Sequence, residues 1–283
     1  MKSLASSFTH INLQPNPKTK TGKDWTKPYV LDEILKSKPK KINRYDDLVK
    51  DVAQLLHRNR QLTLFFRGQT KDYLDKDKRS TILAGIFRKK PGENKLPLKE
   101  RFETLEANVE ELRKAFAKSP IKLAGTLLLN KYPEIGWSLL QHYQVCPTPL
   151  IDITHSLHVA CSFAFEGNTG KTGIVYVLGL PWPTDSISYN TNEELVNIRL
   201  LSICPPQAQR PFFQEGYLLG NFPNYKMDDP SRINQFDPAR RIVAKFEIPI
   251  SESFWGKDFK RIPSDKIYPK KDIVEGICKS IRP

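Results

Sequence analysis

Residues 141–156 gather side chains that can carry acid–base or binding chemistry between two apolar segments. His142 and Asp152 supply groups that take up and release protons. Thr154 and Ser156 supply hydroxyls where a strand is expected to lead into a helix, and the N–H groups of a helix start hold anions and polar ligands. The alternative is that Asp152, Thr154 and Ser156 only cap that helix, and the stretch alone leaves both roles open.

The elements that position this stretch can be predicted from the apolar pattern. The β-rich residues 150–154 follow a Pro-Thr-Pro segment and predict a short buried strand. Residues 157–165 have apolar side chains at helical spacing, with Thr154 or Ser156 as the expected cap. A helix over about 135–143 is expected to deliver His142 to the stretch.

A second candidate group follows an apolar run at residues 62–66. This run predicts a strand that ends at Arg67, Gly68 and Gln69. An arginine in this position suits bidentate contact with a phosphate or carboxylate, and Gly68 would let a ligand approach the backbone. A structural salt bridge of Arg67 is the alternative.

A third group lies in residues 209–218, where Gln214 and Glu215 interrupt aromatic residues just before a glycine. These polar side chains suit the wall of a cleft, and an edge-strand turn explains them as well. Further periodic segments predict helices at 45–56, 98–118 and 271–281 and strands at 173–178 and 241–248, the last half-buried. Helices come first, and strands and helices then alternate irregularly. This order predicts an α+β fold with mixed or antiparallel sheets around a central cleft and flanking helices.

The chain of 283 residues has a formal net charge of +14, and nearly all of the basic excess lies in its first half. Residues 1–150 carry 29 Lys and Arg against 16 Asp and Glu, whereas residues 151–283 carry 16 against 15. This asymmetry predicts a polyanionic partner, nucleic acid first, bound through the N-terminal half. A solvated lysine-rich surface is the alternative.

The spacing of the cysteines and the hydropathy of the chain indicate the cellular compartment in which we expect the protein. The four cysteines are widely spaced without CxxC pairs, which predicts reduced core thiols. No apolar run reaches the roughly 20 residues that span a bilayer, and the N-terminus lacks a signal peptide's apolar region. We therefore expect a cytoplasmic protein without a membrane partner. No motif such as HExxH is present and we expect no metal site, although His155 and His158 near Asp152 could bind a metal.

Three stretches together resemble the FRG-domain family, which is named for its Phe/Tyr-Arg-Gly motif. They are Phe66-Arg67-Gly68-Gln69, the central stretch from Gln141 to Ala164, and Phe213-Gln214-Glu215-Gly216. The resemblance spans about residues 45–283, and we divide the chain into a basic, partly irregular arm at 1–42 and an FRG-like α+β domain at 43–283. This chain departs from the usual family pattern where Gln144 replaces Gly, Pro149 replaces Arg and Ile153 replaces Trp.

The same order of motifs is similar, more weakly, to ADP-ribosyltransferases of the Arg–Ser–Glu type. In that resemblance Arg67 matches the early-strand arginine, Thr154-His155-Ser156 the Ser-Thr-Ser element, and Gln214-Glu215 the late Glu-containing loop. It implies an ADP-ribosyltransferase-like fold, with NAD as substrate. Together with the acid–base pair of the central stretch, the expected catalytic residues are Arg67, His142, Asp152 and Glu215. The implied cofactor-binding residues are Arg67, Gly68, Gln69, Thr154, His155, Ser156 and Gln214.

The resemblance implies ADP-ribosyl transfer or NAD cleavage on an anionic macromolecule, in a protein of a bacterial defence or toxin-like kind. Because a single carboxylate stands where these transferases have a Glu-x-Glu pair, arginine is not implied as the acceptor. Two other functions stay open from the residues. One is a non-catalytic nucleic-acid or protein-binding module, which the basic half and its interleaved aromatic residues suit. The other is a nuclease that uses His142, His155 and Asp152.

Overall fold

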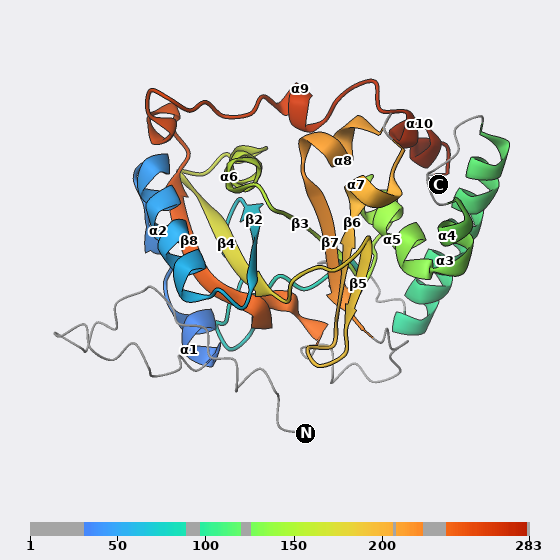
Figure 1. Ribbon diagram of the computed structural model, residues 1–283, viewed down its shortest axis with the longest axis horizontal. Helices are drawn as coiled ribbons and strands as arrows, with labels where there is room; N and C mark the ends of the chain where they lie inside the picture. The colour runs from blue at the N-terminus through green and yellow to red at the C-terminus, as the bar shows by residue number, and fades with distance from the viewer. Residues whose placement is uncertain (1–30, 89–96, 120–125, 206–207, 223–235, 282–283) are drawn as a thin grey trace. The chain divides into compact units, whose positions relative to one another are not determined.

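The computed structural model describes residues 31–88, 97–119, 126–205, 208–222 and 236–281 and divides the chain into two compact units (Figure 1). Unit 1 comprises the residues up to 81 together with 154–182 and 239–264. Unit 2 comprises residues 82–153, 183–238 and 265–283. Helices and strands are interspersed in both units, which confirms the predicted α+β class. The central cleft and the transferase-like fold stay predictions.

Unit 1 contains a mixed sheet with the strand order β1-β8-β4-β2. The β1–β8 pair is parallel, whereas β8–β4 and β4–β2 are antiparallel. Thr154, at the end of β3 (Ile151–Thr154), pairs with Phe66 of β2. The other elements are α1 (Leu31–Lys36), β1 (Lys40–Lys41), α2 (Tyr45–Arg58), β2 (Thr63–Gln69), α6 (Leu157–Phe165), β4 (Thr172–Leu180), β8 (Ile242–Pro249) and the 3-10 turn η5 (Glu252–Trp255).

Helices α2 and α6 cover one face of this sheet. Phe66 of β2, Val175 of β4 and Phe246 of β8 belong to a buried apolar cluster that also contains residues of both helices. Because successive side chains of a strand point to opposite faces, Arg67 lies on the face away from the helices. The predicted strand at 62–69 is therefore confirmed. Its alternation places the core side chains on one face of the sheet and Arg67 on the other.

Gly68 lies where the backbone of α6 comes closest to β2. A Cβ atom added at Gly68 would lie 1.8 Å from the carbonyl oxygen of Ala160 and 2.8 Å from the nitrogen of Ala164. The sequence analysis explained this glycine by the approach of a ligand, but the structure shows the approach of a helix. Contact between the Gly68 backbone and a ligand stays a prediction.

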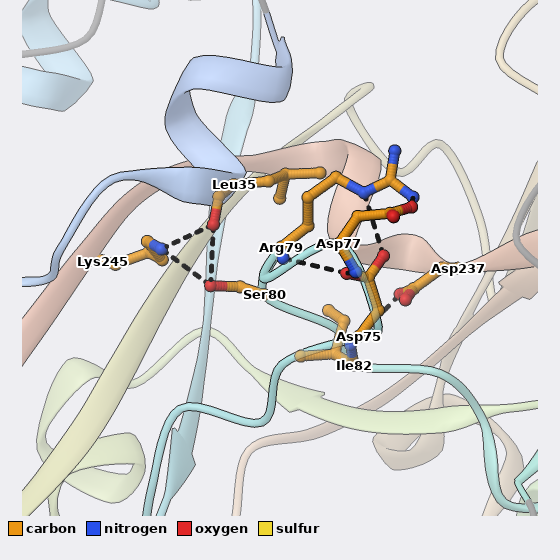
Figure 2. Close-up of polar contacts among 8 residues, drawn as sticks. All are labelled: Leu35, Asp75, Asp77, Arg79, Ser80, Ile82, Asp237 and Lys245. Carbon is orange, nitrogen blue, oxygen red and sulfur yellow. Dashed lines mark hydrogen bonds and ion pairs between the residues drawn. The ribbon is translucent and has the colours of Figure 1, made fainter.

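The opposite face of the sheet carries a cross-strand row of Arg67, Tyr176 and Lys245. Lys245 is 1% exposed, so the expected half-buried alternation of this strand is wrong at this position. Its ammonium group donates to the carbonyl oxygen of Leu35 at 3.0 Å and to Ser80 Oγ at 2.7 Å (Figure 2). Burial lowers the pKa of Lys245. A charge can be buried here because main-chain and side-chain oxygens surround it.

Residues 31–42 belong to the folded unit, although the sequence analysis assigned them to the arm. Lys40 and Lys41 pair with Phe246 and Glu247 in β8, and Ile34 is 1% exposed. The carbonyl oxygens of α1 and the turn after it accept hydrogen bonds from Lys245. Because these residues are held by a lysine about 210 positions away, their place in the folded unit cannot be predicted from the local sequence pattern. Residues 1–30 lie outside the described residues.

Unit 2 contains an antiparallel β7-β6-β5 set of strands and a group of helices in which α3 contacts α4 and α5 (Figure 1). The long helix predicted at 98–118 is confirmed, with its apolar side chains buried at a spacing of three or four. The elements are η2 (Gly85–Phe87), α3 (Leu98–Lys118), α4 (Thr126–Lys131), α5 (Pro133–His142), β5 (Ile187–Asn190), β6 (Leu195–Arg199), α7 (Leu200–Ile203), α8 (Gln209–Phe213), β7 (Gly216–Asn221) and α10 (Ile273–Ser280). The short turns η4 (Pro238–Arg241) and α9 (Ser264–Ile267) lie where the chain passes from one unit to the other.

Within the described ranges, no helix combines the length and the apolar sequence that crossing a membrane would require.

We expect Gly68→Ala to destabilise the protein by about 1–3 kcal/mol, because the new methyl group must displace the backbone of α6. Gly276→Ala in α10 is the matched control, since an added Cβ at Gly276 meets no atom within 4 Å. Chemical denaturation of both variants measures the difference. Equal unfolding free energies for the two variants would contradict the close approach of α6.

Candidate functional site

Arg67 and Gln69 form the first part of the candidate site, on the face of the unit 1 sheet away from α6. Arg67 is half-buried, and its Nε donates to Gln69 Oε1 at 2.9 Å. Gln69 is 9% exposed, and its Nε2 has no hydrogen-bond partner among the described residues. The pair therefore offers a guanidinium and an unsatisfied amide donor side by side, as binding of a polar or anionic ligand requires.

The Thr154-His155-Ser156 segment joins β3 to α6 and satisfies much of its own hydrogen bonding. Ser156 Oγ accepts from the backbone N–H of Val159 at 3.3 Å, and Ser156 is the N-cap of α6. Thr154 is 2% exposed, and its Oγ1 accepts from the N–H of Ser156 at 3.0 Å. The capping role expected for Ser156 is thus confirmed, whereas contact of this segment with NAD stays a prediction.

His155 lies on the same segment, with its ring centroid 4.0 Å from that of Phe65. His158, which the metal alternative required, lies among aromatic rings and its Nε2 is 2.6 Å from the carbonyl oxygen of Lys260. Across the described ranges, no group of three His, Cys, Asp or Glu side chains could hold a metal ion. The structure therefore gives His158 a packing role.

His142 and Asp152 form a hydrogen-bonded pair in unit 2. Nδ1 of His142 lies 3.0 Å from Asp152 Oδ1, and Gln141 Nε2 donates to Asp152 Oδ2 at 2.9 Å. Thr148 Oγ1 in turn donates to Gln141 Oε1 at 2.8 Å. Asp152 is therefore held by the end of helix α5, and it orients an imidazole that comes from that helix. Such support from a carboxylate fixes which ring nitrogen carries the proton.

Burial lowers the pKa of His142, although its hydrogen bond to Asp152 acts in the opposite direction. The charge of Arg210 adds to the lowering. A neutral His142 that donates from Nδ1 to Asp152 leaves Nε2 as an acceptor. This Nε2 is buried without a hydrogen-bond partner among the described residues, and a Cβ added at Gly216 would lie 3.3 Å from His142 Cε1. Gly216 thus leaves room beside the imidazole edge.

Gln214 and Glu215 differ in their surroundings although they are adjacent. Gln214 is 4% exposed and its Nε2 donates to the carbonyl oxygen of Ile267 at 2.9 Å, which holds the turn before β7. Glu215 is exposed and has a φ of 44°, a left-handed conformation that is uncommon for a residue with a side chain. The turn therefore exposes Glu215 to solvent. The predicted contact of Gln214 with the cofactor would compete with its hydrogen bond to Ile267.

Sequence reasoning missed Arg210, which lies in α8 of unit 2. Arg210 is 6% exposed, and its guanidinium lies over the rings of Tyr143 and Tyr268 at 5.6 and 4.8 Å from their centroids. The available signal was an arginine at the start of the aromatic segment 209–213. The segment was interpreted as a cleft wall without a role for this residue.

The structure thus places the predicted residues in two sets. Unit 1 holds Arg67, Gly68, Gln69 and Thr154-His155-Ser156, and unit 2 holds His142, Asp152, Gln214 and Glu215. Within unit 2, the predicted His142 and Asp152 are in direct contact. That the two sets share one cleft stays a prediction.

The pH dependence of stability tests the burial of His142. An unfolded histidine has a pKa of about 6.5 and the folded pKa of His142 is lower, so a falling pH protonates the unfolded chain first. The stability linked to His142 is therefore complete above about pH 6.5 and is lost below it. Between about pH 7 and pH 5 we expect the wild type to lose more unfolding free energy than His142→Asn, by at most about 1.4 kcal/mol per pH unit.

His142→Asn keeps an N–H donor for Asp152 but cannot titrate, and His57→Asn, at an exposed histidine of α2, serves as the control. Denaturant unfolding across this pH range measures the profiles. A His142→Asn profile that follows the wild type would mean that His142 is not a buried neutral base.

The family model of the FRG domain matches residues 63–172. No curated protein and no solved structure matches the chain. The matched residues run from β2 to the start of β4 and include Arg67, Gly68 and the whole stretch from Gln141 to Ser156. Residues 63–172 therefore match the FRG domain, the family that the motifs of this chain resemble.

Proposed function

We propose that this protein cleaves NAD and transfers ADP-ribose to an anionic macromolecule. In the proposed reaction the bond between the nicotinamide nitrogen and the ribose C1′ breaks, and nicotinamide leaves with the bonding electrons. A nucleophilic oxygen or nitrogen of the acceptor, or water, then bonds to C1′ and loses its proton. The observation that carries the proposal is the half-buried Arg67, held by Gln69 beside the strand whose end leads into α6.

The position of Arg67 suits a phosphate anchor. It lies on a strand whose other face is closed by α6, and it belongs to the polar row with Tyr176 and Lys245. Lys245 is 1% exposed and surrounded by protein oxygens, whereas Arg67 is half-buried, and we therefore assign the pyrophosphate contact to Arg67. Gln69 Nε2 adds a donor with no partner among the described residues. Charge-assisted contacts of this kind are the stronger class of hydrogen bond.

Glu215 suits the charge that develops on the ribose. Loss of nicotinamide gives an oxocarbenium-like centre, which a carboxylate stabilises. Glu215 stands directly before β7 in an exposed turn, as the resemblance to the Arg–Ser–Glu transferases implies. The preceding residue, Gln214, is buried and hydrogen-bonded to Ile267, and this bond fixes the position of the Glu215 backbone.

Two substitutions are expected to abolish nicotinamide release for different reasons. Arg67→Ala removes the phosphate anchor and should weaken NAD binding by about 30- to 150-fold, as expected for about 2–3 kcal/mol of charge-assisted bonding. Glu215→Gln keeps the shape but removes the charge, so turnover should fall by about 10²- to 10⁴-fold while NAD binding is retained. Release of nicotinamide from labelled NAD, with and without nucleic-acid and protein acceptors, measures turnover, and calorimetry measures binding.

Glu194→Gln is the matched control for Glu215→Gln. Glu194 is also an exposed glutamate with a positive φ, 51°, and it also stands directly before a strand of unit 2. Full activity of Glu194→Gln with loss in Glu215→Gln would assign the effect to the position. If the wild type neither binds NAD nor releases nicotinamide with any acceptor, the proposal fails and the binding module becomes the better explanation.

The same proposal includes nucleic acid as the anionic partner of the basic half. Residues 1–30 carry five lysines and one aspartate. We expect the full chain to bind duplex and single-stranded oligonucleotides with a steeper salt dependence than a chain that begins at Leu31, because fewer lysines then displace counterions. A start at Leu31 keeps α1, whose Leu35 carbonyl oxygen binds Lys245.

Fluorescence anisotropy at several salt concentrations gives the two slopes, and matched thermal unfolding curves show that both chains are folded. Equal slopes would remove residues 1–30 from the binding surface. No salt-dependent binding by either chain would remove nucleic acid as the partner.

A further inference from the structure

Arg210 is a buried arginine whose guanidinium forms no ion pair with a carboxylate of the described residues. The residue is 6% exposed, and its Nε is buried without a hydrogen-bond partner in the part of the chain that the structure describes. Among the described residues, no carboxylate forms an ion pair with it, and its contacts are the faces of Tyr143 and Tyr268. Removal of a charge from water costs several kcal/mol when no counter-charge replaces the water. An arginine kept in this state needs a reason beyond packing.

Asp272 is the carboxylate that comes nearest to serving as a partner, and its oxygens are engaged elsewhere. Oδ1 accepts from the backbone N–H groups of Val274 and Glu275, which makes Asp272 the N-cap of α10. Oδ2 accepts from the backbone N–H of Arg210, and the hydroxyl of Tyr143 lies 3.1 Å from both oxygens. Asp272 therefore fixes the backbone of α8 and the ring of Tyr143, and its carboxylate forms no ion pair with the guanidinium of Arg210.

The two tyrosines hold the guanidinium in place without neutralising it. A ring face attracts a cation, and such contacts contribute about 0.5–2 kcal/mol, less than the cost of the buried charge. They also leave the N–H groups in the guanidinium plane unused, and these are the groups that bind an oxyanion in a bidentate manner.

We propose that Arg210 is the anchor of a binding site for a small oxyanion, the phosphate or carboxylate group of a small ligand, with Tyr143 and Tyr268 holding its guanidinium. Arg210 keeps 6% of its surface exposed to solvent. The site lies within unit 2, and the proposal does not depend on NAD chemistry.

His142 supplies an internal reporter of an anion at this site. The charge of Arg210 contributes to the lowered pKa of His142. His142 also faces Asp152 and Asp272, whose charges act in the opposite direction. An anion on Arg210 offsets the arginine's effect, so its binding should raise the pKa of His142.

Thermal unfolding with inorganic phosphate and with acetate, each against chloride at constant ionic strength, tests the site and distinguishes the two ligand groups. We expect at least one of the two anions to raise the unfolding temperature of the wild type. Arg210→Met, which keeps an apolar chain between the rings, should lose this shift. Arg210→Lys should keep only part of it, because an ammonium lacks the planar fork. Arg199→Met, at an exposed arginine of β6, should keep it.

A histidine titration followed by NMR provides the second measurement and needs only the wild-type chain. The ring signals of His142 should shift at lower phosphate or acetate concentrations than those of the exposed His57. A shift in unfolding temperature that persists in Arg210→Met would show adventitious binding to the basic surface and overturn the proposal. Wild-type protein in which neither anion moves the unfolding temperature or the His142 signals would overturn it as well.

Discussion

The contact between Gly68 and the backbone of α6 is the constraint on which the arrangement of unit 1 depends. The carbonyl oxygen of Ala160 occupies the position that a side chain at residue 68 would need. Because strand side chains alternate, this contact also directs Phe66 toward α6 and Arg67 to the opposite face. The Phe-Arg-Gly motif thus combines two residues that pack against α6 with an arginine on the opposite face of the sheet.

The end of β3 depends on the same contact. α6 begins at Leu157, directly after the Thr154-His155-Ser156 segment, and Ser156 caps it. A displacement of α6 would therefore move this segment relative to its partner strand β2. This connection explains why the arginine and the hydroxyl-bearing segment occur together although about ninety residues separate them.

Gln144 and Glu215 both have a left-handed backbone. Gln144 has a φ of 55°, which is the left-handed region where glycine is favoured, and the resembling family usually has glycine at this position. Glu215 has a φ of 44° in the turn before β7. Side chains in such conformations cost of order 1 kcal/mol, and at Glu215 this conformation belongs to the residue to which we assign the carboxylate of the proposed chemistry. At Gln144 no comparable role is evident in the structure.

The features predictable from the sequence were those set by local pattern. Helix α3 was predicted from apolar spacing, and the Ser156 cap from residue type. Lys245 could not be predicted as buried, because its strand alternates normally and the oxygens around it come from residues more than 160 positions away. The sequence places His142 and Asp152 in one stretch but does not predict their hydrogen bond, because that bond forms only when the end of a helix packs beside a strand.

The buried charged and titratable side chains of this fold differ in how many of their polar atoms have hydrogen-bond or ion-pair partners. Lys245 is surrounded by oxygens, so its burial is explained by the protein alone. His142 is half satisfied, since Nδ1 is bonded to Asp152 whereas Nε2 is buried without a partner among the described residues. Arg210 lies over two aromatic rings, and no carboxylate among the residues that the structure describes forms an ion pair with it. A buried polar group without a partner costs free energy, and a bound ligand can recover this cost. The burial of Lys245 therefore needs no ligand, whereas a ligand would best explain the burial of Arg210. His142 lies between these two cases.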